Sequence, residues 1–353
     1  MTAECDRVDL EPFSLRLARP LDTARGTIDH REGFLVRVAC DGESGVGEAT
    51  PLPGWTESLD DCEAALERAT ERAGSDGYEA ALDALDARET PAARHGLSLA
   101  LADARARATD EPLYRYLGGE AEVDAVPVNA TVGDGDVETS VADAESAVDE
   151  GFDCLKVKVG ARSLTADFDR VEAVREACPD ATLRADANGS WDRETARRAM
   201  GQFGGHGVEY VEQPLPTGDL TGHADLRGGP VGVALDESLG EHGVDAVLAA
   251  GAADVLVLKP MALGGPDRAR DAALRAREAG LEAVVTTTID AVYARTAAVH
   301  VAASLAPLPA CGLATADFLA EDLASDPAPV VHGAVTVPEG KGNVPAGGGS
   351  SSA

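Results

Sequence analysis

Two lysines lie two residues apart in the run CLKVKVG, residues 154–160, and the whole chain of 353 residues contains only four lysines. Side chains alternate between the two faces of a β-strand, so Lys156 and Lys158 would share one face if this run is a strand. Two ammonium groups on one face repel, and we expect each to lower the pKa of the other, which favours a general base near neutral pH. The alternative is a solvated face of an edge strand, although apolar residues flank the pair on both sides.

Carboxylates follow three other apolar runs, each at the point where a strand would end. Asp186 lies in RADAN, Glu212 in VEQP, and Asp236 with Glu237 in LDES. Only one of the last two can face inward, because neighbouring residues of a strand point to opposite faces. For a single carboxylate, a helix N-cap after the strand is the simpler interpretation. Three carboxylates at matching strand ends, beside a lysine pair, instead predict a site for Mg²⁺, with Mn²⁺ as an alternative. These ions are favoured because the donors are oxygens without His or Cys.

A hard cation flanked by lysines suits the removal of a proton α to a carboxylate. The cation would stabilise the enediolate that forms, and a lysine would take the proton. Lys259, in VLKP, would face the substrate from the side opposite Lys156 and Lys158. Neither His242 nor His300 has metal-like spacing, and we expect both to be structural. Further polar candidates for substrate contacts at strand ends are Asn188, Thr287 and Thr288.

The scaffold for these residues is a repeat that begins near residue 125. Strand-like runs lie at 126–132, 154–160, 182–188, 208–214, 231–237, 254–260, 283–288 and 311–315, and helix-like runs fill the gaps between them. These helices are expected at 137–149, 163–177, 192–203, 218–227, 241–251, 266–279 and 290–305. The alternation predicts an α/β fold, a TIM-type (β/α)7β barrel over residues 121–322, whose active site lies at the C-terminal strand ends.

Residues 1–120 have a different pattern, which predicts an α+β capping domain. Strands are expected at 8–17 and 33–41, and helices at 59–73, 78–88 and 91–107. The polar stretch 23–33 and the segment 47–61 are expected to be loops, with Trp55 either anchoring its loop or covering a ligand. We expect residues 325–345 to fold back onto this domain and residues 346–353 to form a disordered tail.

Composition excludes several classes of function. The formal net charge of −32 argues against a nucleic-acid or anionic membrane partner, and the acidic, lysine-poor composition suits a salt-rich cytoplasm. The chain has no signal-peptide pattern and no apolar run of membrane-spanning length, and its six cysteines are widely spaced, which favours reduced, buried thiols. We therefore expect a cytoplasmic protein whose partner is a small-molecule carboxylate, while the sequence leaves the oligomeric state open.

The ordered set KVKVG, RADAN, VEQP, LDES and VLKP resembles the enolase superfamily, in its muconate-lactonizing-enzyme-like subgroup. Within that subgroup the chain is most similar to the o-succinylbenzoate synthases of menaquinone biosynthesis. The similarity rests on GEATPLPGWTESL in the cap, VLKPMALGG, the threonine-rich TTTID and CGLAT. The implied reaction is the dehydration of 2-succinyl-6-hydroxy-2,4-cyclohexadiene-1-carboxylate to 2-succinylbenzoate.

The resemblance also implies a role for each candidate residue. It assigns acid–base work to Lys158 with support from Lys156, and a cationic role to Lys259. Cap loops would close over the succinyl arm of the substrate. The implied metal ligands are Asp186, Glu212 and Asp236, and the implied cap contacts are Arg31, Pro53 and Trp55.

Three other functions compete with this interpretation. A dipeptide epimerase would use both lysines, but such enzymes typically end strand eight with Asp-x-Asp, whereas this chain has CGLATADF with the single late Asp317. An N-succinylamino acid racemase would share the synthase pocket, and the sequence does not separate the two. A non-catalytic binding protein on an inherited barrel would be expected to have lost a ligand or a lysine, and none is missing.

Overall fold

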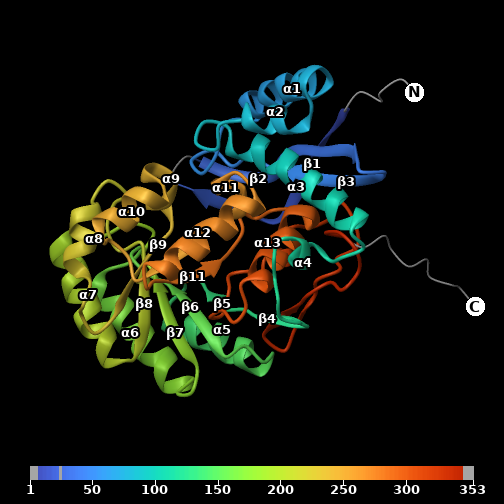
Figure 1. The fold of residues 1–353 in the computed structure, drawn as a ribbon. Coiled ribbons are helices and arrows are strands. Elements are labelled where there is room, and N and C mark those ends of the chain that lie inside the picture. Colours follow the sequence, from blue (N-terminus) through green and yellow to red (C-terminus); the bar gives the residue numbers. More distant parts are fainter. Residues whose placement is uncertain (1–6, 24–25, 345–353) are drawn as a thin grey trace, which may run out of the picture.

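The computed structural model describes residues 7–23 and 26–344 of the chain. It consists of a β/α barrel with a smaller α+β unit packed beside it (Figure 1). The predicted tail, residues 346–353, lies outside the described residues, as does Cys5.

The barrel is a curled parallel sheet of seven strands in the order β11-β10-β9-β8-β7-β6-β5. Their side chains are mostly buried aliphatic residues, as expected of parallel strands covered on both faces. The strands are β5 (Ala130–Val132), β6 (Cys154–Lys158), β7 (Thr182–Asp186), β8 (Val208–Glu212), β9 (Gly232–Leu235), β10 (Val255–Leu258) and β11 (Glu282–Val285). The predicted fold class, a TIM-type barrel with a capping unit, is confirmed.

The predicted eighth strand, residues 311–315, forms only two isolated β-bridges. Cys311 pairs with Val128 and Gly312 with Thr286, so this segment lies between the first and last strands and joins them. The predicted strand 126–132 is also split, into β4 (Ala125–Pro127) and β5, because β4 pairs with a C-terminal strand outside the barrel.

Helices alternate with the barrel strands and cover the outside of the sheet (Figure 1). Side-chain caps begin several of them, for example Asp136 at α5 and Ser163 at α6. The predicted helix 241–251 is two helices, because Gly243, with φ of 79°, separates α9 from α10. The helices are α5 (Val137–Asp149), α6 (Leu164–Ala177), α7 (Arg193–Gly205), α8 (Leu220–Leu226), α9 (Glu237–His242), α10 (Val244–Ala250), α11 (Pro260–Leu263), α12 (Pro266–Glu278) and α13 (Val292–Ser304).

The cap combines the antiparallel sheet β1-β2-β3 with helices α1 to α4. The strands are β1 (Val8–Thr23), β2 (Gly26–Cys40) and β3 (Glu43–Ala49), and the helices are α1 (Leu59–Asp76), α2 (Tyr78–Asp83), α3 (Pro91–Ala108) and α4 (Leu113–Tyr116). The prediction of a loop over 23–33 was wrong. Residues 26–33 pair with β1, because a long hairpin gives even a polar stretch a complete set of backbone partners.

The C-terminal segment contacts both parts of the molecule. Strands β12 (Val330–Val331) and β13 (Ala334–Thr336) form a sheet with β4, beside the barrel. Further on, Gly342 pairs with Pro112, and the Asn343 N–H donates to Asp103 of α3 at 2.7 Å. The expected return onto residues 1–120 therefore begins only after the chain has paired with β4, which precedes the first barrel strand.

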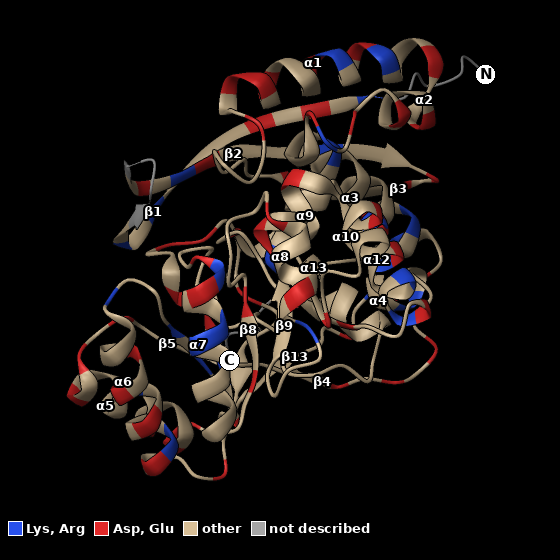
Figure 2. Ribbon diagram, turned by 90° about the vertical axis from the view of Figure 1, so that its left-hand side faces the viewer, with Lys and Arg blue, Asp and Glu red and all other residues tan. Residues whose placement is uncertain are grey.

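Acidic residues are distributed over the outer helices, with basic residues between them (Figure 2). In the described part of the chain, no helix is long and apolar enough to cross a membrane. Four of the five described cysteines are buried, and Cys40 is half-buried.

Candidate active site

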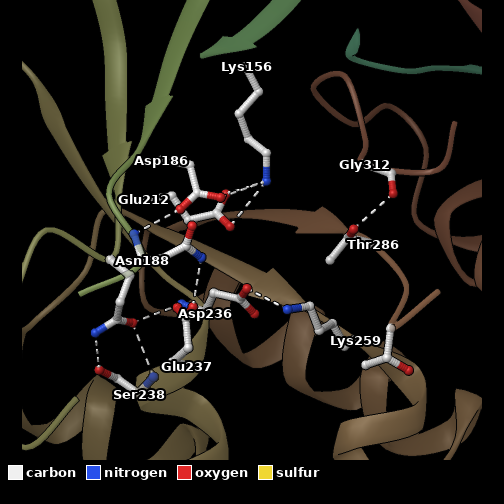
Figure 3. Close-up of polar contacts among 12 residues, drawn as sticks. Lys156, Asp186, Asn188, Glu212, Asp236, Glu237, Ser238, Lys259, Thr286 and Gly312 are labelled. Atoms are coloured by element: carbon white, nitrogen blue, oxygen red, sulfur yellow. Dashed lines mark hydrogen bonds and ion pairs between the residues drawn. The ribbon is translucent and has the colours of Figure 1, made fainter. Parts of the chain in front are cut away.

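The lysine pair lies at the inner face of β6 and contacts the carboxylates of the next two strands. Lys156 Nζ lies 3.2 Å from Asp186 Oδ2 and donates to both oxygens of Glu212, at 3.2 and 3.3 Å (Figure 3). Lys158 Nζ donates to Asp186 Oδ2 at 2.7 Å and to Asn188 Oδ1 at 3.0 Å. The strand prediction therefore placed both lysines on the correct face.

Lys259 lies on the other side of the site, after β10. Its Nζ donates to Asp236 Oδ2 at 2.5 Å and lies 3.2 Å from the centroid of the Trp55 ring. An indole face attracts a cation through its quadrupole, and the interaction strengthens when the cation is shielded from water. The Lys259 side chain is only 12% exposed. Trp55 therefore contacts a candidate catalytic group directly, from a cap loop.

The choice between Asp236 and Glu237 is made by the turn after β9. Asp236 faces Lys259, whereas Glu237 begins α9 and accepts a hydrogen bond from Asn188 Nδ2 at 2.9 Å (Figure 3). Gln213, with φ of 42°, ties this turn to the end of β8, because its Oε1 accepts from the N–H groups of Asp236 and Ser238. The residue after β8 thus positions the turn after β9.

These groups line a cavity of about 370 Å³ at the C-terminal ends of the strands. Thr287 and Thr288 line it as predicted, together with all three lysines, the three carboxylates, Asn188 and Trp55. Thr286, in the same threonine-rich strand end, also lines the cavity. The sequence reasoning did not single out several other lining residues: Leu21, Leu52, Asn129, Thr131, Ile289, Gly312, Ala314, Thr315 and Phe318. The NAT run at the end of strand one was a usable signal for Asn129 and Thr131, since alternate residues of that strand face inward.

Two predicted substrate contacts lie elsewhere. Arg31 is buried, and its guanidinium donates to the carbonyls of Thr50, Pro51 and Ile289, so it joins the cap to the end of strand seven. Pro53 is exposed and lies outside the cavity lining, where its neighbour Leu52 takes the place expected for it.

Burial and pairing set the ionisation of the site. Burial alone would lower the pKa of Lys156, but the carboxylates of Glu212 and Asp186 outweigh it and hold that pKa well above its ordinary value. The expectation of a lowered pKa is thus wrong for Lys156, because two carboxylates contact its ammonium directly. Burial would raise the pKa of Asp186, yet Lys156 and Lys158 hold it well below its usual range. Burial raises the pKa of Asp236 well above its ordinary value despite Lys259.

The carboxylates suit a hard cation in kind and in placement. Asp186, Glu212 and Asp236 are each at most 4% exposed, and they follow three neighbouring strands, β7, β8 and β9. Three buried carboxylates on adjacent strand ends need a concentrated positive charge, and oxygen-only donors select Mg²⁺-like ions. In the arrangement described here each carboxylate is turned toward a lysine, and no group of three or more His, Cys, Asp or Glu among the described residues converges on one point. Joint ligation therefore requires rotation of these side chains.

Comparison with known proteins places this geometry in a family. Residues 139–343 match the model described as enolase C-terminal domain-like, and residues 10–104 match the model described as MenC, N-terminal domain. The L-Ala-D/L-Glu epimerase of Bacillus subtilis (strain 168) is 33% identical over 314 residues, which cover 84% of each chain. The o-succinylbenzoate synthase of Thermobifida fusca (strain YX) is 42% identical over 231 residues, 63% of this chain and 69% of that protein.

Solved structures agree with these sequence matches. The substrate-liganded L-Ala-D/L-Glu epimerase from Bacillus subtilis superposes with a TM-score of 0.85 at 29% identity, covering 95% of this chain and 97% of that one. A dipeptide epimerase from Enterococcus faecalis V583, complexed with Mg and the dipeptide L-Leu-L-Tyr, gives a TM-score of 0.83 at 26% identity, covering 95% and 98%. The barrel, its cap, and the ordered lysines and carboxylates show that this chain belongs to the enolase superfamily, in its muconate-lactonizing-enzyme-like subgroup.

Proposed function

We propose that this enzyme is an o-succinylbenzoate synthase, which dehydrates 2-succinyl-6-hydroxy-2,4-cyclohexadiene-1-carboxylate to 2-succinylbenzoate in menaquinone biosynthesis. The observation that carries the proposal is the charge of the cavity lining. Its only carboxylates are Asp186, Glu212 and Asp236, the three candidate metal ligands, among the described residues that line it. The rest of the lining is apolar or neutral apart from the three lysines, which suits a substrate that carries carboxylates and no amine.

A dipeptide is a poor match for the same cavity. Its α-ammonium would need an anionic partner, because an unpaired charge in a largely buried site is costly. Asp317, the one aspartate of the run CGLATADF, is exposed and does not belong to the lining. The match of residues 10–104 to the MenC N-terminal domain also supports the synthase.

The roles of the residues follow from their places in the site. Asp186, Glu212 and Asp236 would hold Mg²⁺, which would supply positive charge to stabilise the enediolate form of the substrate carboxylate. Lys158, the more exposed of the β6 pair, would remove the α-proton and return a proton to the departing hydroxyl on the same face. Lys259, between Asp236 and the face of Trp55, would act as a fixed cation on the opposite side.

An N-succinylamino acid racemase is the second candidate, and a specific observation favours it. Its substrate also has no free ammonium, and lysines face the cavity from both sides, as proton exchange on both faces requires. The two functions differ in the work assigned to Lys259, which would be a base in the racemase and a cation in the synthase.

The test supplies purified enzyme with the cyclohexadiene substrate and Mg²⁺ at high KCl, and follows the absorbance of the aromatic product. A parallel reaction in D₂O with N-succinylamino acids and with L-Ala-D-Glu follows exchange of the α-proton. Dehydration faster than either exchange supports the synthase. Fast exchange in the dipeptide without dehydration would refute it.

A further inference from the structure

A buried ion pair lies behind the strand that carries Lys158. Asp167 and Arg170 are both on α6, and their side chains are 0% and 1% exposed, with Arg170 Nη1 3.2 Å from Asp167 Oδ1. A buried pair of charges repays its desolvation only when further hydrogen bonds satisfy both groups. The partners of these two side chains therefore indicate what the pair is for.

The side chains of Asp167 and Arg170 both hydrogen-bond to the backbone at the end of β6. Arg170 Nη1 donates to the carbonyl of Lys158 at 2.7 Å, and the N–H of Gly160 donates to Asp167 Oδ2 at 2.8 Å. Between them, the N–H of Val159 donates to the carbonyl of Asp186 at 2.9 Å. Three consecutive residues, beginning with Lys158, are thus fixed by groups outside their own strand.

The same arginine reaches the neighbouring strand end. Its Nη2 donates to the carbonyl of Gly133, just after β5, and its Nε donates to Ser140 Oγ at 2.8 Å. Gly160 has a φ of 89°, and a Cβ there would lie 1.9 Å from Ser190 Oγ, so the backbone after Lys158 has little room to shift. The pair therefore connects two adjacent strand ends through one guanidinium.

We propose that Asp167 and Arg170 are positioning residues, which hold the backbone of Lys158 so that its ammonium stays in register with the substrate. This inference rests on the proposed role of Lys158 as the acid–base group. Neither side chain lines the catalytic cavity, and both act through the backbone of β6. A displacement of about 1 Å at a reacting group can cost about 10²-fold in rate, so the loss should appear in kcat and not in KM.

The same helix supplies a matched control. Arg175 also donates to several backbone carbonyls, including those of His206 at 2.8 Å and Ala181 at 2.8 Å. Those carbonyls precede β8 and β7, at the end of the barrel opposite the catalytic strand ends. If the arginines of α6 that donate to backbone carbonyls serve stability alone, Arg170→Met and the half-buried Arg175→Met should behave alike.

The experiment measures melting temperature, kcat and KM for wild type, Arg170→Met, Arg170→Lys and Arg175→Met, well below the lowest melting temperature. We expect Arg170→Met to lose about 10²-fold in kcat with KM within about threefold. Arg170→Lys, which keeps the charge near Asp167, should lose less, and Arg175→Met should keep wild-type kcat. Since Arg170→Met can fail to fold, Arg170→Lys with Asp167→Asn provides a second pair for the same comparison.

The outcomes separate this inference from the proposed function. If wild type does not dehydrate the cyclohexadiene, the synthase proposal fails, and the same variants are compared by α-proton exchange on whichever carboxylate wild type accepts. A kcat loss confined to the Arg170 and Asp167 variants supports the positioning role in either case. Equal kcat for the folded Arg170 and Arg175 variants, with only their melting temperatures lowered, would overturn it.

Discussion

Separate replacement of the lysines should divide the two catalytic roles. Lys158→Ala removes the more exposed candidate base on its face, because the Lys156 side chain is 15% exposed against 34% for Lys158 and its ammonium is held by Glu212 at 3.2 and 3.3 Å. General-base catalysis contributes about 10²- to 10⁴-fold, so we expect kcat to fall by about 10³-fold. Lys158→Arg should be equally inactive, since a guanidinium does not lose its proton near neutral pH.

Lys259 should tolerate arginine better than alanine. A unit charge about 4 Å from a developing negative charge, at an effective dielectric constant of about 20, contributes about 4 kcal/mol, or about 10³-fold in rate. Lys259→Ala should therefore lose about 10³-fold in kcat. Lys259→Arg keeps the charge beside Asp236 but must displace the ring of Trp55, now 3.2 Å from the ammonium, so we expect it to exceed Lys259→Ala by at least about tenfold.

The assay is turnover of the cyclohexadiene substrate with Mg²⁺, with circular dichroism to verify folding. Lys341→Ala is the control, because the Lys341 ammonium pairs with Glu43 on the surface of the cap, and this variant should match wild type. Equal and complete loss in both Lys259 variants, together with efficient racemisation of N-succinylamino acids by wild type, would refute the cationic role. The racemase would then be the better interpretation.

Three further predictions concern the metal, pH and salt. Asp186→Asn and Asp236→Asn should abolish Mg²⁺ binding measured by calorimetry, whereas Glu237→Gln should retain it; full activity after EDTA treatment would contradict the metal site. Burial raises the pKa of Glu48 from its ordinary 4.5 to about 7, so the native state keeps a proton that the unfolded chain releases. Stability should therefore fall by up to about 3 kcal/mol as pH rises from about 4.5 through 7, and urea titrations of Glu48→Gln should lack that slope. With a formal charge of −32, the melting temperature should rise from dilute to molar KCl, and a flat curve would mean that the acidic surface is not a salt adaptation.

Local patterns were sufficient to predict the barrel and the core of its site. The alternation of Lys156 and Lys158 with apolar neighbours required one face of a strand, and both lysines lie on that face. Asp186 and Glu212 end strands that hydrogen-bond to each other, and the repeat of strand and helix alone predicted that neighbouring strand ends meet. These predictions needed only the period of a strand and the direction of a parallel sheet.

The cap could not be predicted in the same way. Residues 26–33 are polar, yet they are strand because β1 pairs with them, and pairing over a long hairpin depends on both segments at once. Arg31 is of a type that often binds carboxylate substrates, but its guanidinium donates to three carbonyls from two distant segments, those of Thr50, Pro51 and Ile289. A side chain's partners are set by the packing of distant segments, which local periodicity does not encode.

The sequence by itself therefore determined which residue types end each strand, and with them the class of chemistry. The strand pattern alone left Asp236 and Glu237 open, and the family resemblance pointed to Asp236. In the structure Asp236 faces the cavity because Gln213 of the preceding strand end holds the turn. Only the tertiary structure decided the charge state of Lys156, since two buried carboxylates from other strands outweigh both burial and the neighbouring lysine. Electrostatic energy depends on the distance between charges, and only the folded barrel brings charges from different strand ends close together.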